Sequence, residues 1–205
     1  MIRHRLMRAV AAGLTGLLLA VCLTPARPAA AQSPDDKRRA DDVRIALLRL
    51  PYYGVFDFLS FTYERGTVTL TGFAYAPRLR EDAEAAVERT PGVDTVKNQI
   101  EVASASLNDD RIRRDGFAAI YTDDFLSRYS PGGARRAYID ALEFGRYPGI
   151  QPLGNYPIHI IVKGGRITLV GLVDNDADKQ IAGVRAREVS GAFGVENELV
   201  VRGSK

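Results

Sequence analysis

The chain is poor in the residues that carry covalent, redox or metal chemistry. It has one cysteine, two histidines and no tryptophan, and both Cys22 and His4 lie within the first 31 residues. The remainder therefore keeps one histidine, His159, and no cysteine. This excludes disulfides and a thiolate nucleophile there, and a lone histidine assembles neither a multi-histidine metal site nor a catalytic constellation. We expect no catalytic residue, no metal and no cofactor.

Residues 1–31 have the layout of a secretory signal peptide. Three arginines precede an apolar run over about residues 9–23, and alanines at 29–31 then offer a small-residue cleavage site. The run is shorter than the roughly 20 apolar residues that span a bilayer, which disfavours an uncleaved anchor. Lipid attachment at Cys22 is not expected, because Val21 occupies a position where a small residue is required. We therefore expect export with cleavage of this segment.

Removing this segment also removes the basic excess of the chain. Residues 1–31 carry four arginines and no acidic residue, so the remainder has 24 basic and 25 acidic residues. A nucleic-acid-binding protein would show a clustered basic excess, so no nucleic-acid partner is expected. Residues 32–205 are enough for one or two small domains with real cores.

One structural unit occurs twice in this remainder. The run GTVTLTG at residues 66–72 recurs 99 positions later as GRITLVG at 165–171, and VKN at 96–98 recurs as VEN at 195–197 with the same offset. The two copies align without a gap from residue 66 to residue 102. Two motifs with unchanged spacing indicate a duplicated fold.

Each copy predicts the order helix, strand, strand, helix, strand. Period-2 alternation and glycine turns predict hairpins, and a helical stretch and a last strand follow each one. The fold class is therefore α+β, with two small α-β-β-α-β domains, each a three-stranded sheet with helices on one face. In the first copy the expected strands and helix are 58–63, 67–71, 77–89 and 96–102; in the second they are 158–162, 166–170, 176–189 and 195–201. The inward rows would be Leu59, Phe61, Tyr63, Val68 and Leu70, and Ile158, Ile160, Val162, Ile167 and Leu169.

An aspartate pair marks the opening helix of each copy, Asp41-Asp42 and Asp109-Asp110. We interpret these pairs as helix caps rather than metal ligands. The expected domains are then 38–103 and 107–202. Asn98 and Asn197, which are equivalent in the two copies, are expected to make the same turn or strand-edge hydrogen bonds.

The second copy holds 31 extra residues, because its opening helix is offset by 68 positions and its hairpin by 99. This insert spans about residues 122–157 and contains a helix candidate over 134–144. The expected apolar stripe of that helix is Ala137, Tyr138, Ala141 and Leu142, with Arg135-Arg136 off the stripe. Long insertions between elements are often functional.

The G-x-[V/I]-T-L-x-G hairpin, the step to V-x-N and the preceding helix resemble the BON domain, and the tandem arrangement behind a signal peptide resembles OsmY-like periplasmic proteins. The resemblance implies a non-enzymatic periplasmic protein that binds anionic phospholipid membrane surfaces and supports envelope integrity under osmotic or other stress. It supplies no catalytic residues. The alternative is a periplasmic adaptor that binds another envelope protein through the insert or an exposed sheet face.

Lipid contact requires cations that meet anionic headgroups, together with apolar side chains that enter the interface. Two groups of residues could supply such a surface, although each could also be an ordinary solvated helix face. The first group lies in the insert: Arg135, Arg136, Tyr138, Phe144, Arg146 and Tyr147. The second lies on the later helix of the second copy: Lys179, Arg185 and Arg187.

Three further features have simpler interpretations. Residues 51–56 form an aromatic loop, of which we expect at least two rings to pack in a core. Alternation places His159 on the sheet face away from the helices, where it is expected to be a hydrogen-bonded interface residue. A hydrolase is the least favoured hypothesis, because it rests only on the proximity in sequence of acidic residues, namely Asp123, Asp124, Asp140 and Glu143.

Overall fold

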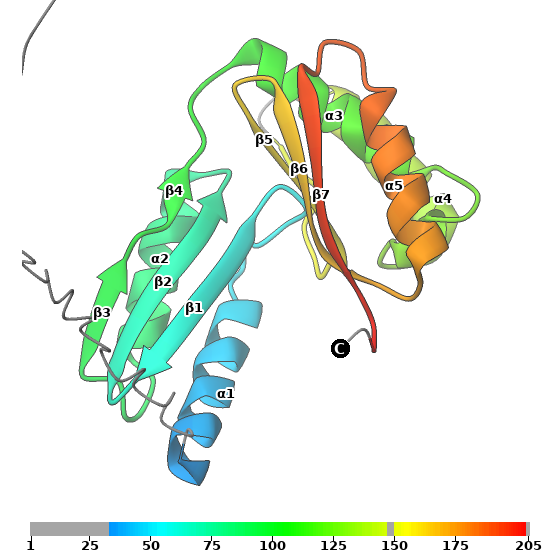
Figure 1. Cartoon of the computed structure of the whole chain (residues 1–205). Coiled ribbons are helices and arrows are strands. Elements are labelled where there is room, and N and C mark those ends of the chain that lie inside the picture. The colour runs from blue at the N-terminus through cyan, green and yellow to red at the C-terminus, as the bar shows by residue number, and fades with distance from the viewer. Residues whose placement is uncertain (1–32, 147–149, 204–205) are drawn as a thin grey trace, which may run out of the picture. The chain divides into compact units, whose positions relative to one another are not determined.

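The computed structural model describes residues 33–146 and 150–203, which belong to one compact unit, residues 32–205 (Figure 1). The segment expected to be a signal peptide and the candidate residue Tyr147 lie outside the described residues. None of the helices within the described ranges is long and apolar enough to cross a membrane.

The first repeat has the predicted element order. β1 and β2 form an antiparallel hairpin, and β3 and β4 both pair in parallel with β2. The single last strand expected over residues 96–102 is thus interrupted at Gln99–Ile100, where Ile100 turns into the core at 3% exposure. The elements are α1 (Pro34–Leu48), β1 (Phe58–Glu64), β2 (Thr67–Ala74), α2 (Pro77–Glu88), β3 (Thr95–Asn98) and β4 (Glu101–Val102).

The second repeat has the same order with additional helices after its first. β5 pairs antiparallel with β6, and β7 runs parallel to β6 along its whole length. The α+β fold class is confirmed, and so is the helix expected in the insert. The elements are α3 (Leu107–Tyr121), the 3-10 helix η1 (Ser127–Tyr129), α4 (Gly133–Arg146), β5 (Ile158–Lys163), β6 (Arg166–Val173), α5 (Asp176–Arg187) and β7 (Gly194–Val201).

Close backbone packing explains one pair of glycines shared by the two copies. Gly72 and Gly171 have φ values of 113° and 133°, in the region that L side chains rarely adopt. A Cβ atom on either glycine would lie 2.0 Å from a carbonyl oxygen of the paired strand or its approach, that of Phe58 or Pro157. A glycine is therefore required at this position, where the two strands of each hairpin approach closely at the end away from the turn.

The hydrophobic cores of the two repeats differ in how fully they are buried and in which segments contribute to them. All five inward residues of the second hairpin are fully buried, whereas Leu59 and Phe61 of the first are only partly buried. The second core also includes Val55 and Phe56 from the loop before β1. Val55 O accepts a hydrogen bond from Ile160 N at 2.9 Å, so this loop lies along β5. Phe56 is fully buried and Tyr53 is half-buried, which agrees with the packing expected for the aromatic loop.

The interpretation of Asp41 as a helix cap was wrong. α1 begins earlier, at Pro34, and Ser33 Oγ caps it by accepting a hydrogen bond from Asp36 N at 3.1 Å. Asp41 therefore lies within the helix, where it forms an exposed ion pair with Arg44 one turn away.

Asp109 is likewise not the cap of its own helix. Ser106 Oγ caps α3, accepting from Asp109 N at 3.2 Å. The Asp109 carboxylate instead accepts hydrogen bonds from Gly164 N at 2.9 Å and Gly165 N at 2.8 Å. It thereby supplies the hydrogen-bond acceptor for two backbone N–H groups in the turn of the β5–β6 hairpin. These two residues lie 55 and 56 positions after Asp109.

Candidate functional site

The insert helix α4 presents a different side to its domain from the one expected. Its buried positions are Ala137, Asp140 and Phe144. Of the predicted stripe, Ala137 is buried and Ala141 packs against the core, whereas Tyr138 and Leu142 are 58% and 54% exposed. The apolar stripe is therefore rotated about the helix axis relative to the prediction.

Phe144 does not belong to an accessible surface. It is 5% exposed, and its ring centroid lies 5.2 Å from that of Phe56 and 6.3 Å from that of Phe117. Phe144 is thus a core residue, which corrects its place among the candidate surface residues.

The outer face of α4 combines apolar and cationic side chains. Arg135, Tyr138, Leu142 and Arg146 are all exposed and are separated by steps of three or four residues, which places them in one line along the helix. Arg136 lies beside this line, where its Nε forms an ion pair with Asp140 at 2.7 Å. We call Arg135, Tyr138, Leu142 and Arg146 the α4 outer face.

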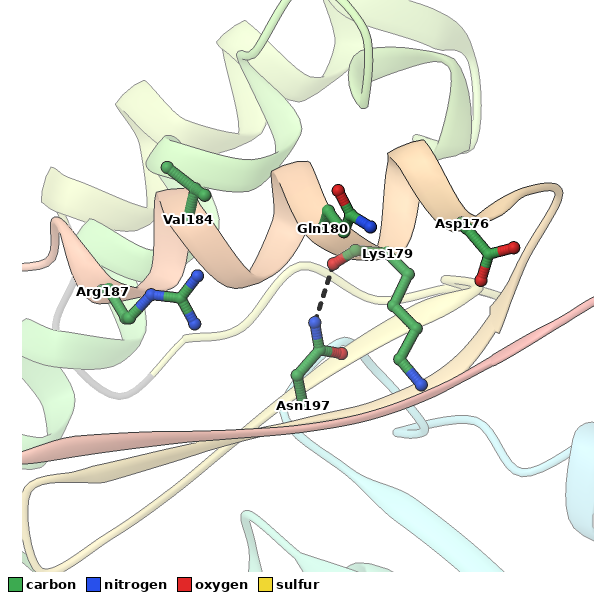
Figure 2. Close-up of a pocket in the computed structure, with 6 residues that line it drawn as sticks. All are labelled: Asp176, Lys179, Gln180, Val184, Arg187 and Asn197. Atoms are coloured by element: carbon green, nitrogen blue, oxygen red, sulfur yellow. Dashed lines mark hydrogen bonds between the residues drawn. The ribbon is translucent and has the colours of Figure 1, made fainter.

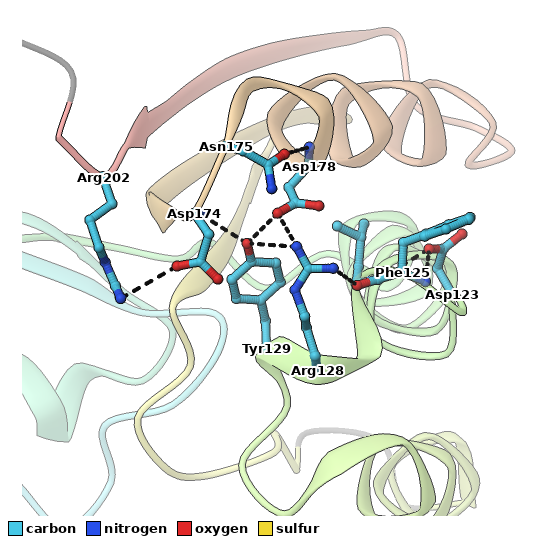
Figure 3. Close-up of polar contacts among 9 residues, drawn as sticks. Asp123, Phe125, Arg128, Tyr129, Asp174, Asn175, Asp178 and Arg202 are labelled. Atoms are coloured by element: carbon cyan, nitrogen blue, oxygen red, sulfur yellow. Dashed lines mark hydrogen bonds and ion pairs between the residues drawn. The ribbon is translucent and has the colours of Figure 1, made fainter.

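A polar cluster fixes the start of the insert to the start of α5 (Figure 3). Tyr129 Oη donates to Asp178 Oδ2 at 2.6 Å and accepts from Asp174 N at 2.9 Å. Arg128 forms an ion pair with the same Asp178 carboxylate, which is buried. The insert is therefore held to the repeat by hydrogen bonds as well as by its core.

Arg185, one of the predicted surface cations, instead binds the insert and so helps to hold it against α5. Its Nε donates to Asp123 Oδ2 at 2.8 Å, and its Nη1 donates to Glu188 at 3.1 Å. Burial acts to raise the pKa of Asp123, but the hydrogen bond from Arg185 and those from two backbone N–H groups outweigh it and lower the pKa. Asp123 thus remains a structural carboxylate.

The acidic residues near one another in the insert do not converge on a reactive site. Asp123 is bound to Arg185, and Asp140 accepts a hydrogen bond from Tyr156 Oη at 2.9 Å. Asp124 and Glu143 are exposed. No group of three or more potential metal ligands occurs among residues 33–146 and 150–203.

The remaining predicted cations, Lys179 and Arg187, line a groove between α5 and β7 with a volume of about 440 Å³. Figure 2 shows both side chains extending from α5 on the side that faces Asn197 of β7. Asn197 Nδ2 donates to the carbonyl oxygen of Lys179 at 2.7 Å, and its Oδ1 accepts from Leu199 N at 3.3 Å. The other lining residues are Asp176, Gln180 and Val184.

Asn98 makes the same two bonds in the first repeat. Its Nδ2 donates to the carbonyl oxygen of Arg80 at 3.0 Å, and its Oδ1 accepts from Ile100 N at 3.2 Å. The expectation that the two asparagines make equivalent local hydrogen bonds is confirmed. Each also ties the last strand to the preceding helix, which was not predicted.

His159 lies at an interface, as alternation predicted. It is 7% exposed, and its ring lies 5.5 Å from that of Tyr53 and 5.7 Å from that of Phe58. Its Nδ1 has no hydrogen-bond partner within the described part of the chain. Burial lowers the pKa of His159 to about 4, although hydrogen bonds to the backbone of Gly54 and Asp57 act in the opposite direction.

Asp57, in the same loop, is a buried carboxylate that sequence reasoning missed. It accepts hydrogen bonds from Gly54 N at 2.8 Å, Tyr75 N at 2.6 Å and Gln151 Nε2 at 2.8 Å. Burial nevertheless raises the pKa of Asp57 to about 6. The one available signal was a lone aspartate between aromatic residues, while its partner Gln151 lies 94 positions away.

These features define a duplicated α+β protein whose second repeat carries an inserted helix with an exposed cationic and apolar face. The BON domain family matches residues 35–104 and 147–203, and the chain belongs to this family. The match omits α3, η1 and α4, so the α4 outer face lies outside the matched segments.

BON domains are associated with phospholipid binding and with envelope and osmotic-stress proteins. BON-domain proteins are generally non-enzymatic and are often periplasmic or envelope-associated.

Two solved structures with similarity to this chain come from CdsD, a structural protein of the type III secretion system of Chlamydia trachomatis. One shares 14% identity over 79% of this chain and 91% of that chain, with a TM-score of 0.25. The other, of the C-terminal domain of CdsD, shares 14% identity over 83% of this chain and 99% of that chain, with a TM-score of 0.26. No curated protein matches.

Proposed function

We propose that the chain is an exported, non-enzymatic envelope protein that binds anionic phospholipid membrane surfaces through the α4 outer face. The observation that carries this proposal is the exposure of Tyr138 and Leu142 between Arg135 and Arg146 on a helix whose opposite side is packed in the core. By this binding the protein would support envelope integrity under osmotic or other stress.

The physical basis is the behaviour of interfacial helices. An amphipathic helix lies in the membrane plane with its apolar side chains at the boundary between headgroups and acyl chains. Each arginine near an anionic surface contributes about 1 kcal/mol, and this contribution weakens with ionic strength. Two arginines and two apolar side chains support weak, salt-sensitive association that other contacts of the protein would reinforce.

The proposal keeps the processing site and the domain boundaries that the sequence predicts. Residues 1–31 would be removed as a signal peptide, and residues 38–103 and 107–202 would be the two BON domains, the second with its insert at 122–157.

Co-sedimentation with vesicles tests this proposal on the chain from Gln32 to Lys205, the compact unit. Binding to phosphatidylglycerol-rich vesicles at low salt is expected, with little binding to phosphatidylcholine vesicles. The double substitution Tyr138→Ala with Leu142→Ala should reduce binding strongly. The matched control is Ile45→Ala with Leu48→Ala on α1, which removes two comparably exposed side chains, 45% and 51%, from another helix.

Charge is tested in the same assay. Arg135→Gln with Arg146→Gln should weaken binding, whereas Arg49→Gln with Lys97→Gln, which removes the same charge elsewhere, should not. If both double variants on α4 bind like their controls, the α4 outer face is not the membrane surface. If the unaltered chain binds no anionic vesicle, lipid recognition fails, and crosslinking in cells that depends on residues 130–146 would then favour the adaptor function.

A further inference from the structure

We propose that the groove between α5 and β7 is a binding site for a phosphate group, present in the second repeat and absent from the first. This inference goes beyond membrane association through α4, because it concerns different residues and a soluble ligand tests it. It rests on how the two repeats differ at equivalent positions.

The two repeats differ first in the hydrogen bonds made by their equivalent asparagines, Asn98 and Asn197. In the first repeat the Asn98 amide donates to the carbonyl oxygen of Arg80 and also to Glu84 Oε2 at 2.9 Å. In the second repeat the position equivalent to Glu84 is Gly183, which has no side chain. Asn197 Nδ2 therefore uses one hydrogen for Lys179 O, and its other hydrogen has no acceptor among the residues that the structure describes.

The missing side chain also opens the groove. A Cβ atom added to Gly183 would lie 2.8 Å from Asn197 Nδ2, and the terminal nitrogens of Arg187 lie 3.5 Å and 3.7 Å from that same Cβ position. The glycine thus lets the Asn197 amide and the Arg187 guanidinium approach the same stretch of α5. A side chain at this position would occupy the space between them.

The charge of the helix face is inverted between the repeats. In the first repeat the face carries one cation, Arg80, and three carboxylates, Glu81, Glu84 and Glu88. The equivalent positions of the second repeat are Lys179, Gln180, Gly183 and Arg187. Two cations thus stand where the first repeat has one, and no carboxylate replaces the three that are lost.

Both cations remain available. No ion pair or side-chain hydrogen bond engages Lys179 or Arg187 within residues 33–146 and 150–203, in contrast to the neighbouring Arg185. The one carboxylate that lines the groove is Asp176, in the first turn of α5, whereas Arg187 is at the other end of the helix (Figure 2). Lys179 and Arg187 extend on opposite sides of Asn197 (Figure 2), so the Arg187 side of the groove carries positive charge with no lining carboxylate beside it.

The donor set matches a phosphate group better than a carboxylate. A guanidinium offers two parallel N–H donors, the ammonium offers a point charge with rotatable donors, and the amide adds a neutral N–H. These donors approach from the helix and from the strand. A tetrahedral phosphate presents oxygens in three or more directions and can accept from the Asn197 amide and the Arg187 guanidinium together, while Lys179 adds positive charge from the other side of Asn197 (Figure 2). A carboxylate presents two oxygens in one plane. A phosphomonoester, a lipid phosphodiester or inorganic phosphate would supply this chemistry.

The experiment is an NMR titration of residues 32–205 that follows the side-chain amide of Asn197. Inorganic phosphate is the first probe, and acetate is the control for a planar anion. Phosphate should shift the Asn197 signal with a dissociation constant on the order of 1 mM, and acetate should bind more weakly. Equal affinity for the two anions would overturn the assignment to phosphate.

Substitution identifies the groups that bind. Arg187→Gln and Lys179→Gln should each lower phosphate affinity about tenfold, the loss expected when one charge-assisted hydrogen bond is removed. Arg49→Gln, which removes an exposed arginine elsewhere, should leave it unchanged. Circular dichroism checks that each variant is folded. If phosphate does not shift Asn197, or if the shift persists unchanged in both groove variants, the proposal is wrong.

A final comparison distinguishes a lipid headgroup from a free phosphate and separates this site from the α4 outer face. The probe is soluble glycerophosphoglycerol, the headgroup of phosphatidylglycerol. Competition by this diester with vesicle binding, together with loss of vesicle binding in Arg187→Gln, supports a lipid headgroup as the source. Phosphate binding that survives the Tyr138→Ala and Leu142→Ala double substitution supports a groove that works independently, even where vesicle binding through α4 fails.

Discussion

The Asp109 carboxylate accepts a hydrogen bond from the backbone N–H of Gly165 at 2.8 Å, although the two residues lie 56 positions apart. Its second oxygen accepts from the adjacent Gly164 N, and the side chain is 5% exposed. A buried residue of α3 therefore accepts the hydrogen bonds of the tight turn in a hairpin that supplies two of the three strands of the sheet.

Asp109→Ala should destabilise the protein by about 1–3 kcal/mol, because it leaves the buried N–H of Gly165 and the partly buried N–H of Gly164 without their acceptor. The free energy of unfolding from urea denaturation measures this loss. Asp41→Ala is the control: Asp41 makes only an exposed ion pair within its own helix, and its loss should change stability by less than about 0.5 kcal/mol. Similar values for the two substitutions would contradict the role of Asp109 at the turn.

Phe144→Ala should cost about 3–5 kcal/mol of stability, since it opens a cavity beside Phe56 and Phe117. Tyr138→Ala on the same helix should cost less than about 0.5 kcal/mol, because the Tyr138 side chain is 58% exposed. Denaturation of the two variants side by side determines which face of α4 is packed. A larger loss for Tyr138→Ala would mean that the helix is rotated back to the orientation expected from sequence.

His159→Phe should change how stability depends on pH. The pKa of His159 is lowered from 6.5 to about 4 by burial, so between these values the unfolded chain binds a proton that the folded chain does not. The contribution of the neutral imidazole is thus complete above pH 6.5 and is lost as the pH falls towards 4. Relative to the unaltered protein, the variant should gain about 3 kcal/mol of stability between pH 7 and pH 4.

Asp57→Asn should change the pH dependence in the opposite direction. Burial raises the pKa of Asp57 from 3.8 to about 6, so the folded chain holds a proton in this range that the unfolded chain releases. The corresponding stability is complete below pH 3.8 and is lost as the pH rises through 6. The variant lacks this loss, so relative to the unaltered protein it should gain about 3 kcal/mol between pH 4 and pH 7.

Both pH predictions are measured as differences from the unaltered protein at each pH, so that all other titrating groups cancel. Urea denaturation at pH 4, 5, 6 and 7 gives the two curves. Because the two groups have opposite effects over nearly the same range, the two difference curves should slope in opposite directions. Parallel curves for a variant and the unaltered protein would show that the group titrates normally in the folded state.

Local patterns predicted the repeated fold well, because each hairpin and helix is determined by residues close together in sequence. Alternation identified the inward rows of both hairpins, and Asn175 caps α5 at the boundary that the pattern indicated. These features depend on backbone geometry and on which face is apolar, both of which a short window of sequence contains.

Most of the failures involve contacts between distant segments; Asp41 is the exception, because the nearby Ser33 caps α1 instead. The aspartate pairs have the composition of a helix cap, but the partner of Asp109 is a turn that only the folded chain brings close. The α4 helix has two possible apolar sides, and the sequence of the helix alone cannot choose between them. Phe56, 88 positions before Phe144, makes the choice by packing against one side.

The Lys179–Arg187 groove was only partly visible in sequence. Both cations were predicted as a surface, together with Arg185. Arg185 differs from them because Asp123, 62 positions away, binds it. A short stretch of sequence around Gly183 does not reveal its role, because the groove forms only where Asn197 of β7 lies beside that glycine.

Duplication commonly yields modules that can be moved between proteins or used alone. This chain has departed from that pattern, because Val55 and Phe56 from the first copy complete the hydrophobic core of the second. A gene segment that encodes only the second copy would lack part of its own interior. The two halves therefore depend on each other for folding, as one compact unit.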